Sequence, residues 1–378
     1  MSRAFHRILI LSIFSGVASA AASQECTLKN IDVCMQADPA SAKSVLLREV
    51  DQGGGVEALV ALGKFYREAP VPYRDFGKAV AAYQKAVDQD TPWAAIPLAE
   101  MLFKGEGVAA DPDRALALLD GAEKAGLVGP AQKTLGDHYR TTGEPAKAVA
   151  AYQKAVDQDT PWAAIPLAEM LFKGEGVAAD PDRALALLHR AQQIPSLKAS
   201  VAVSLGYYFL GTGNTKKAIA EFESGSALGE PWAKLGLATT LVHIGETGRA
   251  RQLLEQLRDL SFVPAYSSLI GLVAGNYADI KNMELAVALL DEAFKKDRTV
   301  GLQAFDGLPA NAKAAAIQVA LKASRLYDGP VNGLLTKKTL VSIANFCRSA
   351  AIEKKCQLEA MPKSLLQALL MHSTAAKS

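Results

Sequence analysis

One feature restricts the fold of this chain more than any other: a long segment occurs twice without a single change. Residues Lys78–Leu119 recur as Lys147–Leu188, at an offset of 69 residues. Such a repeat predicts a modular stack, because a unit can be inserted in register only where each module contacts its neighbours alone. The offset is close to twice a unit of roughly 34 residues, so each copy is expected to hold two units.

Each unit is predicted to be a pair of helices. In the first copy, apolar residues at helical spacing lie on both sides of a glycine-rich turn, Gly105–Val108. Asp111 can cap the second helix, and Pro112 suits its first position, where no amide hydrogen is needed. Two prolines complicate this pattern. Pro97 and Pro166 fall inside the predicted first helices, so each helix either begins later than the preceding Pro-Trp pair suggests or kinks there.

The same pattern continues outside the two copies. It predicts an all-α stack of about seven helix pairs between Val56 and Arg298. The second helices are expected at Lys78–Val87, Lys147–Val156, Lys216–Gly225 and Arg249–Leu257, and a further pair at Ala265–Ala274 and Met283–Phe294.

The three tryptophans of the chain each follow a proline, at Trp93, Trp162 and Trp232. They are spaced 69 and 70 residues apart. Packing between adjacent repeats is the simpler interpretation of these side chains, and an aromatic row for a ligand is the alternative.

The turn and helix GEGV-x-x-D-x-x-x-A-L, at Gly105–Leu116 and Gly174–Leu185, resembles the Sel-one-like repeat. The shorter unit that begins at Leu135–Tyr139 is similar to a tetratricopeptide repeat. The resemblance implies a right-handed α-solenoid over residues 56–298, whose first helices line a concave groove for protein or peptide partners. If the apolar residues of each first helix face the core, ten residues are expected on the groove side. They are Lys64, Arg67, Glu100, Phe103, Lys104, Asp137, Arg140, Glu169, Phe172 and Lys173. Their mixed charges indicate neither a strongly acidic nor a strongly basic ligand.

Residues 1–22 have the pattern of a secretory signal peptide. Arg3 and Arg7 precede a short apolar run, and small residues allow cleavage near Ala20 to Ala22. We therefore expect export, most simply to a bacterial periplasm. Gln24 and Glu25 stand where a lipobox requires small residues, which argues against lipidation of the next cysteine. Removing Arg3 and Arg7 from the 41 basic residues leaves 39, equal to the 39 acidic residues.

The four cysteines form two close pairs, Cys26 with Cys34 and Cys347 with Cys356. Three connectivities are possible, and export together with the local spacing favours a disulfide within each pair. Metal binding is a weaker alternative, because the chain has no CxxC and no histidine beside either pair. The first pair belongs to an expected N-terminal cap at residues 23–55.

Residues 299–378 break the repeat. Helices are expected at Ala312–Arg325, from Thr336, and after Pro362, with a turn-rich loop before the second. Tyr327, Gly329, Gly333, Thr339 and Phe346 fit the pattern of the small peptidoglycan-binding-like domain, which this segment resembles. The resemblance implies glycan contact through Tyr327, Asp328 and Asn332, although Asn332 replaces the usual aspartate. The alternative role of these three residues is to build the loop itself.

Composition and motifs exclude several classes of function. The near-zero net charge of +2 argues against nucleic acid as a partner, and we expect no integral membrane segment after signal cleavage. No zinc-ligand spacing or nucleophile motif can be assembled, so we expect neither an enzyme nor a metal or cofactor.

The sequence therefore predicts an exported cell-envelope scaffold that binds protein or peptide partners, docked to peptidoglycan and serving exopolysaccharide assembly or its regulation. Two alternatives stay open. One is a periplasmic enzyme that interacts with β-lactams or glycans. It is disfavoured because the related β-lactam-binding proteins carry a cysteine pair in every repeat, whereas these repeats carry none. The other is a purely structural, wall-anchored protein.

Overall fold

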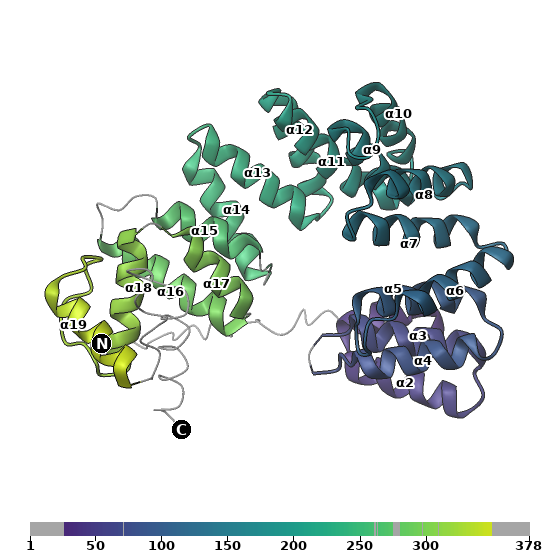
Figure 1. The fold of residues 1–378 in the computed structure, drawn as a ribbon, viewed down its shortest axis with the longest axis horizontal. Coiled ribbons are helices and arrows are strands. Elements are labelled where there is room, and N and C mark those ends of the chain that lie inside the picture. Colours follow the sequence, from purple (N-terminus) through teal and green to yellow (C-terminus); the bar gives the residue numbers. More distant parts are fainter. Residues whose placement is uncertain are drawn as a thin grey trace, which may run out of the picture. The chain divides into compact units, whose positions relative to one another are not determined.

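The computed structural model describes residues 26–70, 72–260, 262, 264–274, 280–296, 298–308 and 310–349. Within these ranges every regular element is a helix (Figure 1). The chain divides into two compact units: Met1–Met170 with Gly174–Ala178, and Leu171–Lys173 with Ala179–Ser378. The predicted signal peptide, Cys356 and the helix expected after Pro362 lie outside the described residues.

The first unit begins with a short helical cap and continues as antiparallel helix pairs. The cap contains η1 (Leu28–Asn30), α1 (Ile31–Ala37) and α2 (Pro39–Asp51). The pairs are α3 (Gly55–Glu68) with α4 (Phe76–Val87), α5 (Ala95–Lys104) with α6 (Pro112–Lys124), and α7 (Val128–Thr141) with α8 (Pro145–Asp157). Short 3₁₀ turns, η2 (Pro92–Ala94) and η3 (Pro161–Ala163), precede α5 and α9 (Ala164–Lys173).

The second unit continues the pattern from the end of α9. Its helices are α10 (Pro181–Ala191), α11 (Lys198–Gly211), α12 (Thr215–Ala227), α13 (Pro231–His243), α14 (Thr247–Asp259), α15 (Pro264–Ala274) and α16 (Ile280–Lys296), followed by α17 (Arg298–Gly307), α18 (Ala310–Ala323) and α19 (Lys337–Ser349), with a 3₁₀ turn η4 (Pro195–Leu197) before α11. The helices α3 to α16 are the seven predicted pairs, so the predicted solenoid is confirmed. The sequence did not predict α17.

The expected capping chemistry fixes where the second helices begin. Asp111 accepts a hydrogen bond from the Arg114 amide at 3.0 Å, and Pro112 occupies the first helical position. Asp180 repeats this arrangement in the second copy. An aspartate cap satisfies one of the backbone donors that a helix leaves unpaired at its start. The same residues thus set the same helix boundary in both copies.

The two interior prolines do not kink their helices. The Pro-Trp residues form the 3₁₀ turn, and α5 begins only at Ala95, which places Pro97 in its first turn. Amides of the first turn have no partner within the helix, so a proline there sacrifices no hydrogen bond. Pro166 has the same position in α9. The later start, one of the two sequence alternatives, is the one that the structure has.

Close packing within the pairs depends on glycine opposite an aromatic ring. A Cβ atom placed on Gly136 would lie 2.5 Å from the ring of Tyr152, which is fully buried. Gly63 has the same relation to Tyr83, and Gly206 to Phe222. Only a glycine allows the first helix to approach the ring this closely. The third case shows that the period of about 70 residues continues into α11 and α12, beyond the two identical copies.

In the second unit, the last repeat helices and the helices that follow them share one hydrophobic core. Buried residues from α13 to α19 form a single cluster that includes Tyr266, Phe305, Ile317 and Phe346. This cluster crosses residue 298, where the sequence predicts a domain boundary. Among the described residues, the helices that follow the repeats therefore pack onto the repeats. No separate hydrophobic core begins between α16 and α18.

Candidate partner-binding surface

Side chains of successive first helices meet along the surface that the sequence predicts for the groove. In the first unit, Arg67 of α3 lies 2.9 Å from a carboxylate oxygen of Glu100 on α5 and 3.3 Å from one of Glu106. Burial opposes the charge of this guanidinium, yet the two carboxylates raise the pKa of Arg67 above its usual value. All three side chains are less than a third exposed. The three side chains therefore join neighbouring repeats and leave little charge for a ligand.

The arrangement recurs between α7 and α9. Arg140 lies 3.1 Å from Glu169, which is the counterpart of Glu100 at an offset of 69 residues. Here too burial opposes the charge while Glu169 raises the pKa of Arg140. This second pair is more exposed, at 38% and 34% of the two side chains. Four of the ten predicted groove residues are thus brought together in two ion pairs.

The two predicted phenylalanines stack on rings of the next first helix. Phe103 stacks on His138 with ring centroids 3.8 Å apart, and burial lowers the pKa of this histidine. In the second unit, Phe172 stacks on Tyr208 at 3.9 Å. Both phenylalanines are half-buried. The stacks fill the space between successive first helices, so their main contact is internal.

The remaining predicted groove residues are more accessible. Lys64 is half-buried, with 41% of its side chain exposed, and pairs with Asp32 of α1 at 2.8 Å. Asp137 accepts a hydrogen bond from the Tyr152 hydroxyl at 2.7 Å. The two lysines that end α5 and α9 are exposed. They are Lys104, which lies 3.8 Å from Glu106, and Lys173.

We refer to the side chains of Lys64, Arg67, Glu100, Phe103, Lys104, Asp137, Arg140, Glu169, Phe172 and Lys173 as the first-helix row.

The three tryptophans lie near the starts of α5, α9 and α13, outside this row. Trp93, Trp162 and Trp232 keep 43%, 48% and 49% of their surface exposed. The packing that the sequence favoured therefore covers about half of each indole.

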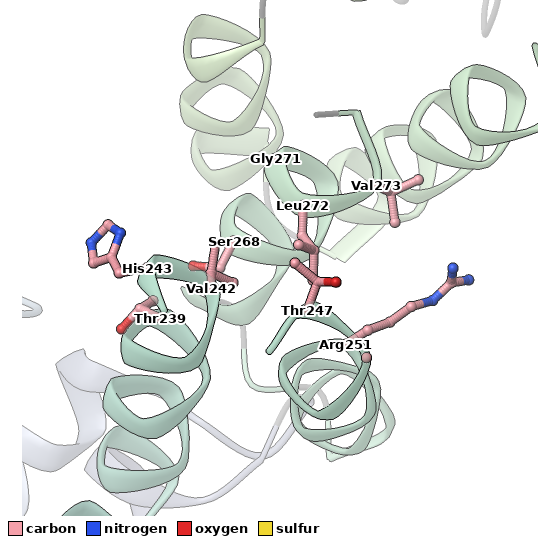
Figure 2. Close-up of a pocket in the computed structure, with 10 residues that line it drawn as sticks. Thr239, Val242, His243, Thr247, Arg251, Ser268, Gly271, Leu272 and Val273 are labelled. Atoms are coloured by element: carbon pink, nitrogen blue, oxygen red, sulfur yellow. The ribbon is translucent and has the colours of Figure 1, made fainter. Parts of the chain in front are cut away.

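The third copy of the row was not predicted, and it differs from the first two. Counting from the Pro-Trp pair, Thr239, Val242 and His243 of α13 stand where the first copy has Glu100, Phe103 and Lys104. These residues line a pocket of about 760 Å³ between α13, α14 and α15 (Figure 2). The spacing of the tryptophans was the signal that could have located this site in the sequence.

The C-terminal residues predicted to contact glycan mainly build their own loop. Tyr327 is buried, and its hydroxyl donates to the Pro330 carbonyl at 3.0 Å. The Asn332 side chain accepts from the amide of Leu334 and from buried Gln318. Asp328 is exposed and pairs with Lys338 at 2.7 Å. Of the three, only Asp328 projects into solvent. The sequence analysis did not identify Gln318 of α18, whose side chain hydrogen-bonds the loop.

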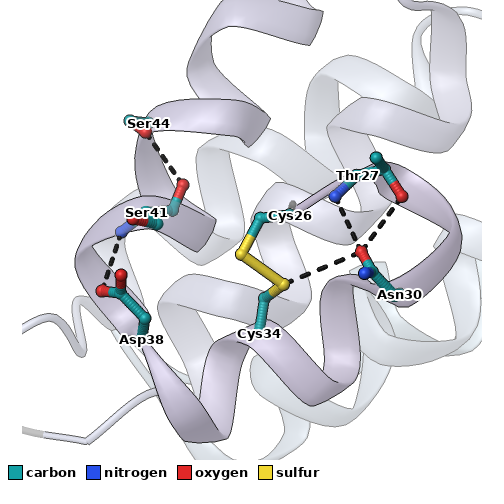
Figure 3. The surroundings of a disulfide bond; sticks show 7 residues. All are labelled: Cys26, Thr27, Asn30, Cys34, Asp38, Ser41 and Ser44. Carbon is teal, nitrogen blue, oxygen red and sulfur yellow. Dashed lines mark hydrogen bonds between the residues drawn. A yellow bond between two sulfur atoms is a disulfide. The ribbon is translucent and has the colours of Figure 1, made fainter. Parts of the chain in front are cut away.

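The N-terminal cap contains the disulfide between Cys26 and Cys34, with Cα atoms 5.9 Å apart (Figure 3). It fixes the residues before α1 against that helix, close to the Thr27 and Asn30 turn. Cys347 on α19 is also disulfide-bonded. Its expected partner, Cys356, lies outside the described residues.

No protein-family model matches this chain, and no curated protein matches it. Solved structures do resemble it. A Sel1 repeat protein from Oxalobacter formigenes is 22% identical, and the match covers 58% of this chain and 91% of that one with a TM-score of 0.46. Yeast Tom70 is 16% identical, covering 85% of this chain and 64% of that one, with a TM-score of 0.53. A monomeric mutant of IFIT1 with m7Gppp-AAAA is 14% identical, covering 92% and 80%, with a TM-score of 0.53.

The likeness to Tom70 and IFIT1 shows the class of fold, a stack of helical pairs. At these identities it shows nothing further about ligand or partner. Among the described residues, no helix is both long and apolar enough to cross a membrane.

Proposed function

We propose that this protein is a scaffold that binds protein partners along the first-helix row. The observation that carries the proposal is the regular alignment of side chains on successive first helices. Polar, cationic and aromatic groups recur there at one spacing, and within one compact unit an extended partner can contact several helices at once. The internal ion pairs hold this surface in one arrangement, which lowers the ordering cost of binding.

The place of action belongs to the same proposal. The signal-like residues 1–22 support work in the cell envelope, and the neutral charge of the chain after their removal is compatible with mixed polar contacts. Docking to peptidoglycan would involve the exposed Asp328 of the C-terminal loop rather than Tyr327 and Asn332. A role in exopolysaccharide assembly or its regulation remains the narrower form of this proposal.

Site-specific photocrosslinking in the producing cell tests the proposal. A photoreactive amino acid replaces Lys104 or Lys173 on the first-helix row. Matched control positions are Lys85 on α4 and Asp113 on α6, which are exposed on second helices. We expect a discrete crosslinked protein, identified by mass spectrometry, from the row positions and not from the controls.

The same experiment separates the alternatives. Equal crosslinking from all four positions, or from Lys85 and Asp113 alone, would place binding on the other face of the stack. No crosslinked protein from any position would favour a purely structural role. Sedimentation of the purified Asp328→Ala variant with peptidoglycan sacculi, beside the unchanged protein, tests the docking separately.

A further inference from the structure

The pocket of the second unit lies at the place where the repeated surface changes its chemistry. In the first two copies, a glutamate, a phenylalanine and a lysine stand seven, ten and eleven residues after the tryptophan. In α13 the same places hold Thr239, Val242 and His243. The ring is lost, and so is the carboxylate. A surface that is filled by internal contacts elsewhere is therefore open at this copy.

Small residues on the facing helix keep the space open. Gly271 of α15 is exposed, and a Cβ atom built on it would have no neighbour within 4 Å. Gly248 at the start of α14 is equally open. Val242 and Leu272 provide apolar walls, and Ser268 lies beside them (Figure 2). A volume of about 760 Å³ falls in the range of ligand pockets, ~300–1,000 Å³.

Arg251 is the one formally charged side chain among the described residues that line the pocket. Figure 2 shows His243 at one side of the pocket and Arg251 at the other. No aspartate or glutamate is among the described residues that line it. Arg251 pairs with Glu255 through Nε at 2.9 Å, and among the described residues its two terminal nitrogens make no hydrogen bond, so they can donate to a second carboxylate. The lining therefore complements a group that is apolar in its body and anionic beside it.

We infer that this pocket receives a bulky apolar side chain of a partner peptide, together with a carboxylate next to it in the peptide. The inference rests on the proposed function and adds to it a specific binding site for one side chain of the partner. The partner side chain takes the space between first helices that Phe103 and Phe172 fill in the other copies. Its carboxylate meets Arg251 of α14, in a copy whose first helix has Thr239 where the first two copies have a glutamate.

Saturation-transfer NMR with short synthetic peptides tests the inference on the full mature protein. The probe is the capped tetrapeptide acetyl-Gly-Phe-Asp-Gly-amide. Two matched peptides replace its aspartate by lysine or its phenylalanine by alanine. We expect saturation of the phenyl protons for the first peptide, about 3- to 10-fold weaker binding when aspartate is replaced, since a charge-assisted hydrogen bond is lost, and no signal above background for the alanine peptide.

Variants locate the binding in the pocket. Gly271→Leu fills the open space and should abolish the phenyl signal, and Gly271→Ala, which adds one carbon, should weaken it. Arg251→Gln should weaken binding of the aspartate peptide without affecting that of the lysine peptide. The matched control is Arg249→Gln, on the same helix but paired with Glu223 outside the pocket. Circular dichroism verifies that each variant is folded.

Two results would overturn the inference: an undiminished phenyl signal in folded Gly271→Leu, or equal binding of the aspartate and lysine peptides. Either result leaves the proposed function standing if Lys104 and Lys173 still give a discrete crosslinked partner. Absence of row crosslinks combined with peptide binding in the pocket would instead refute the scaffold proposal and keep the pocket.

Discussion

Replacing Gly136 by alanine offers a direct test of how the helix pairs are held together. The added Cβ atom would lie 2.5 and 2.6 Å from two ring atoms of Tyr152, whereas ordinary contacts begin at 3.4 Å. The ring must therefore move by about 1 Å in a close-packed interior. It is fully buried, and its hydroxyl donates to Asp137 at 2.7 Å, so the movement disturbs that hydrogen bond as well.

The magnitude follows from three contributions. Overpacking of this kind costs about 1–3 kcal/mol. Loss of the hydrogen bond adds about 1 kcal/mol. Alanine in place of a helical glycine returns about 1 kcal/mol. We therefore expect Gly136→Ala to lower the free energy of unfolding by about 1–3 kcal/mol.

Urea denaturation followed by circular dichroism measures this change. The matched control is Gly121→Ala on α6, because a Cβ atom there has no neighbour within 4 Å. Without a clash, only the propensity gain remains, and the control should raise the unfolding free energy by up to about 1 kcal/mol. In a Tyr152→Leu background, where the clashing ring is absent, Gly136→Ala should lower the unfolding free energy by less than it does in the unchanged protein.

The packing argument would be refuted if Gly136→Ala unfolded at the same urea concentration as Gly121→Ala, or at a higher one. The close approach of α7 to α8 would then not depend on glycine. The same would hold for the equivalent pairs of Gly63 with Tyr83 and Gly206 with Phe222, which share the geometry.

Two further changes test the turns and the core. Asp159 has a left-handed φ of 50°, whereas Gly229 occupies the equivalent turn before Trp232. Because glycine adopts this conformation without strain, Asp159→Gly should stabilise the protein by about 1 kcal/mol in the same urea assay. Lower stability would contradict this. Burial and a hydrogen bond to Glu292 raise the pKa of Tyr266 to about 12. A raised pKa favours the neutral phenol, so this stabilisation is present below pH 10 and is lost as the pH rises from about 10 to 12. The phenolate absorbance that Tyr266→Phe removes should therefore titrate near 12, and titration near 10 would contradict the burial of this hydroxyl.

Most of the fold was predictable because the signals are local and repeated. The internal copies, the helical spacing and the Asp-Pro caps predicted seven helix pairs, with second helices that begin within about two or three residues of those observed. The first helices were placed less securely. Pro97 and Pro166 allowed two interpretations, and only the 3₁₀ turns before α5 and α9 decided between them.

The candidate surface was predicted in part. Helix phase predicted that Arg67, Glu100, Arg140 and Glu169 lie on the groove side. It did not predict that they form two ion pairs, because a pairing across helices depends on rotamers and on distances between repeats. The pocket beside Val242 was missed for a related reason. Val242 stands where the first two copies have a phenylalanine. This loss of a ring is visible in the sequence only when the third copy is aligned with the first two.

The sequence by itself determined the class of fold, the repeat period and the ends of most helices, because capping, turn chemistry and hydrophobic spacing act over a few residues. Tertiary structure decided which side chains of the first-helix row form ion pairs or ring stacks and which are exposed. It also decided that the repeats and the helices after residue 298 share one core. These outcomes depend on how closely neighbouring helices approach, and that distance is set by packing between residues far apart in the chain.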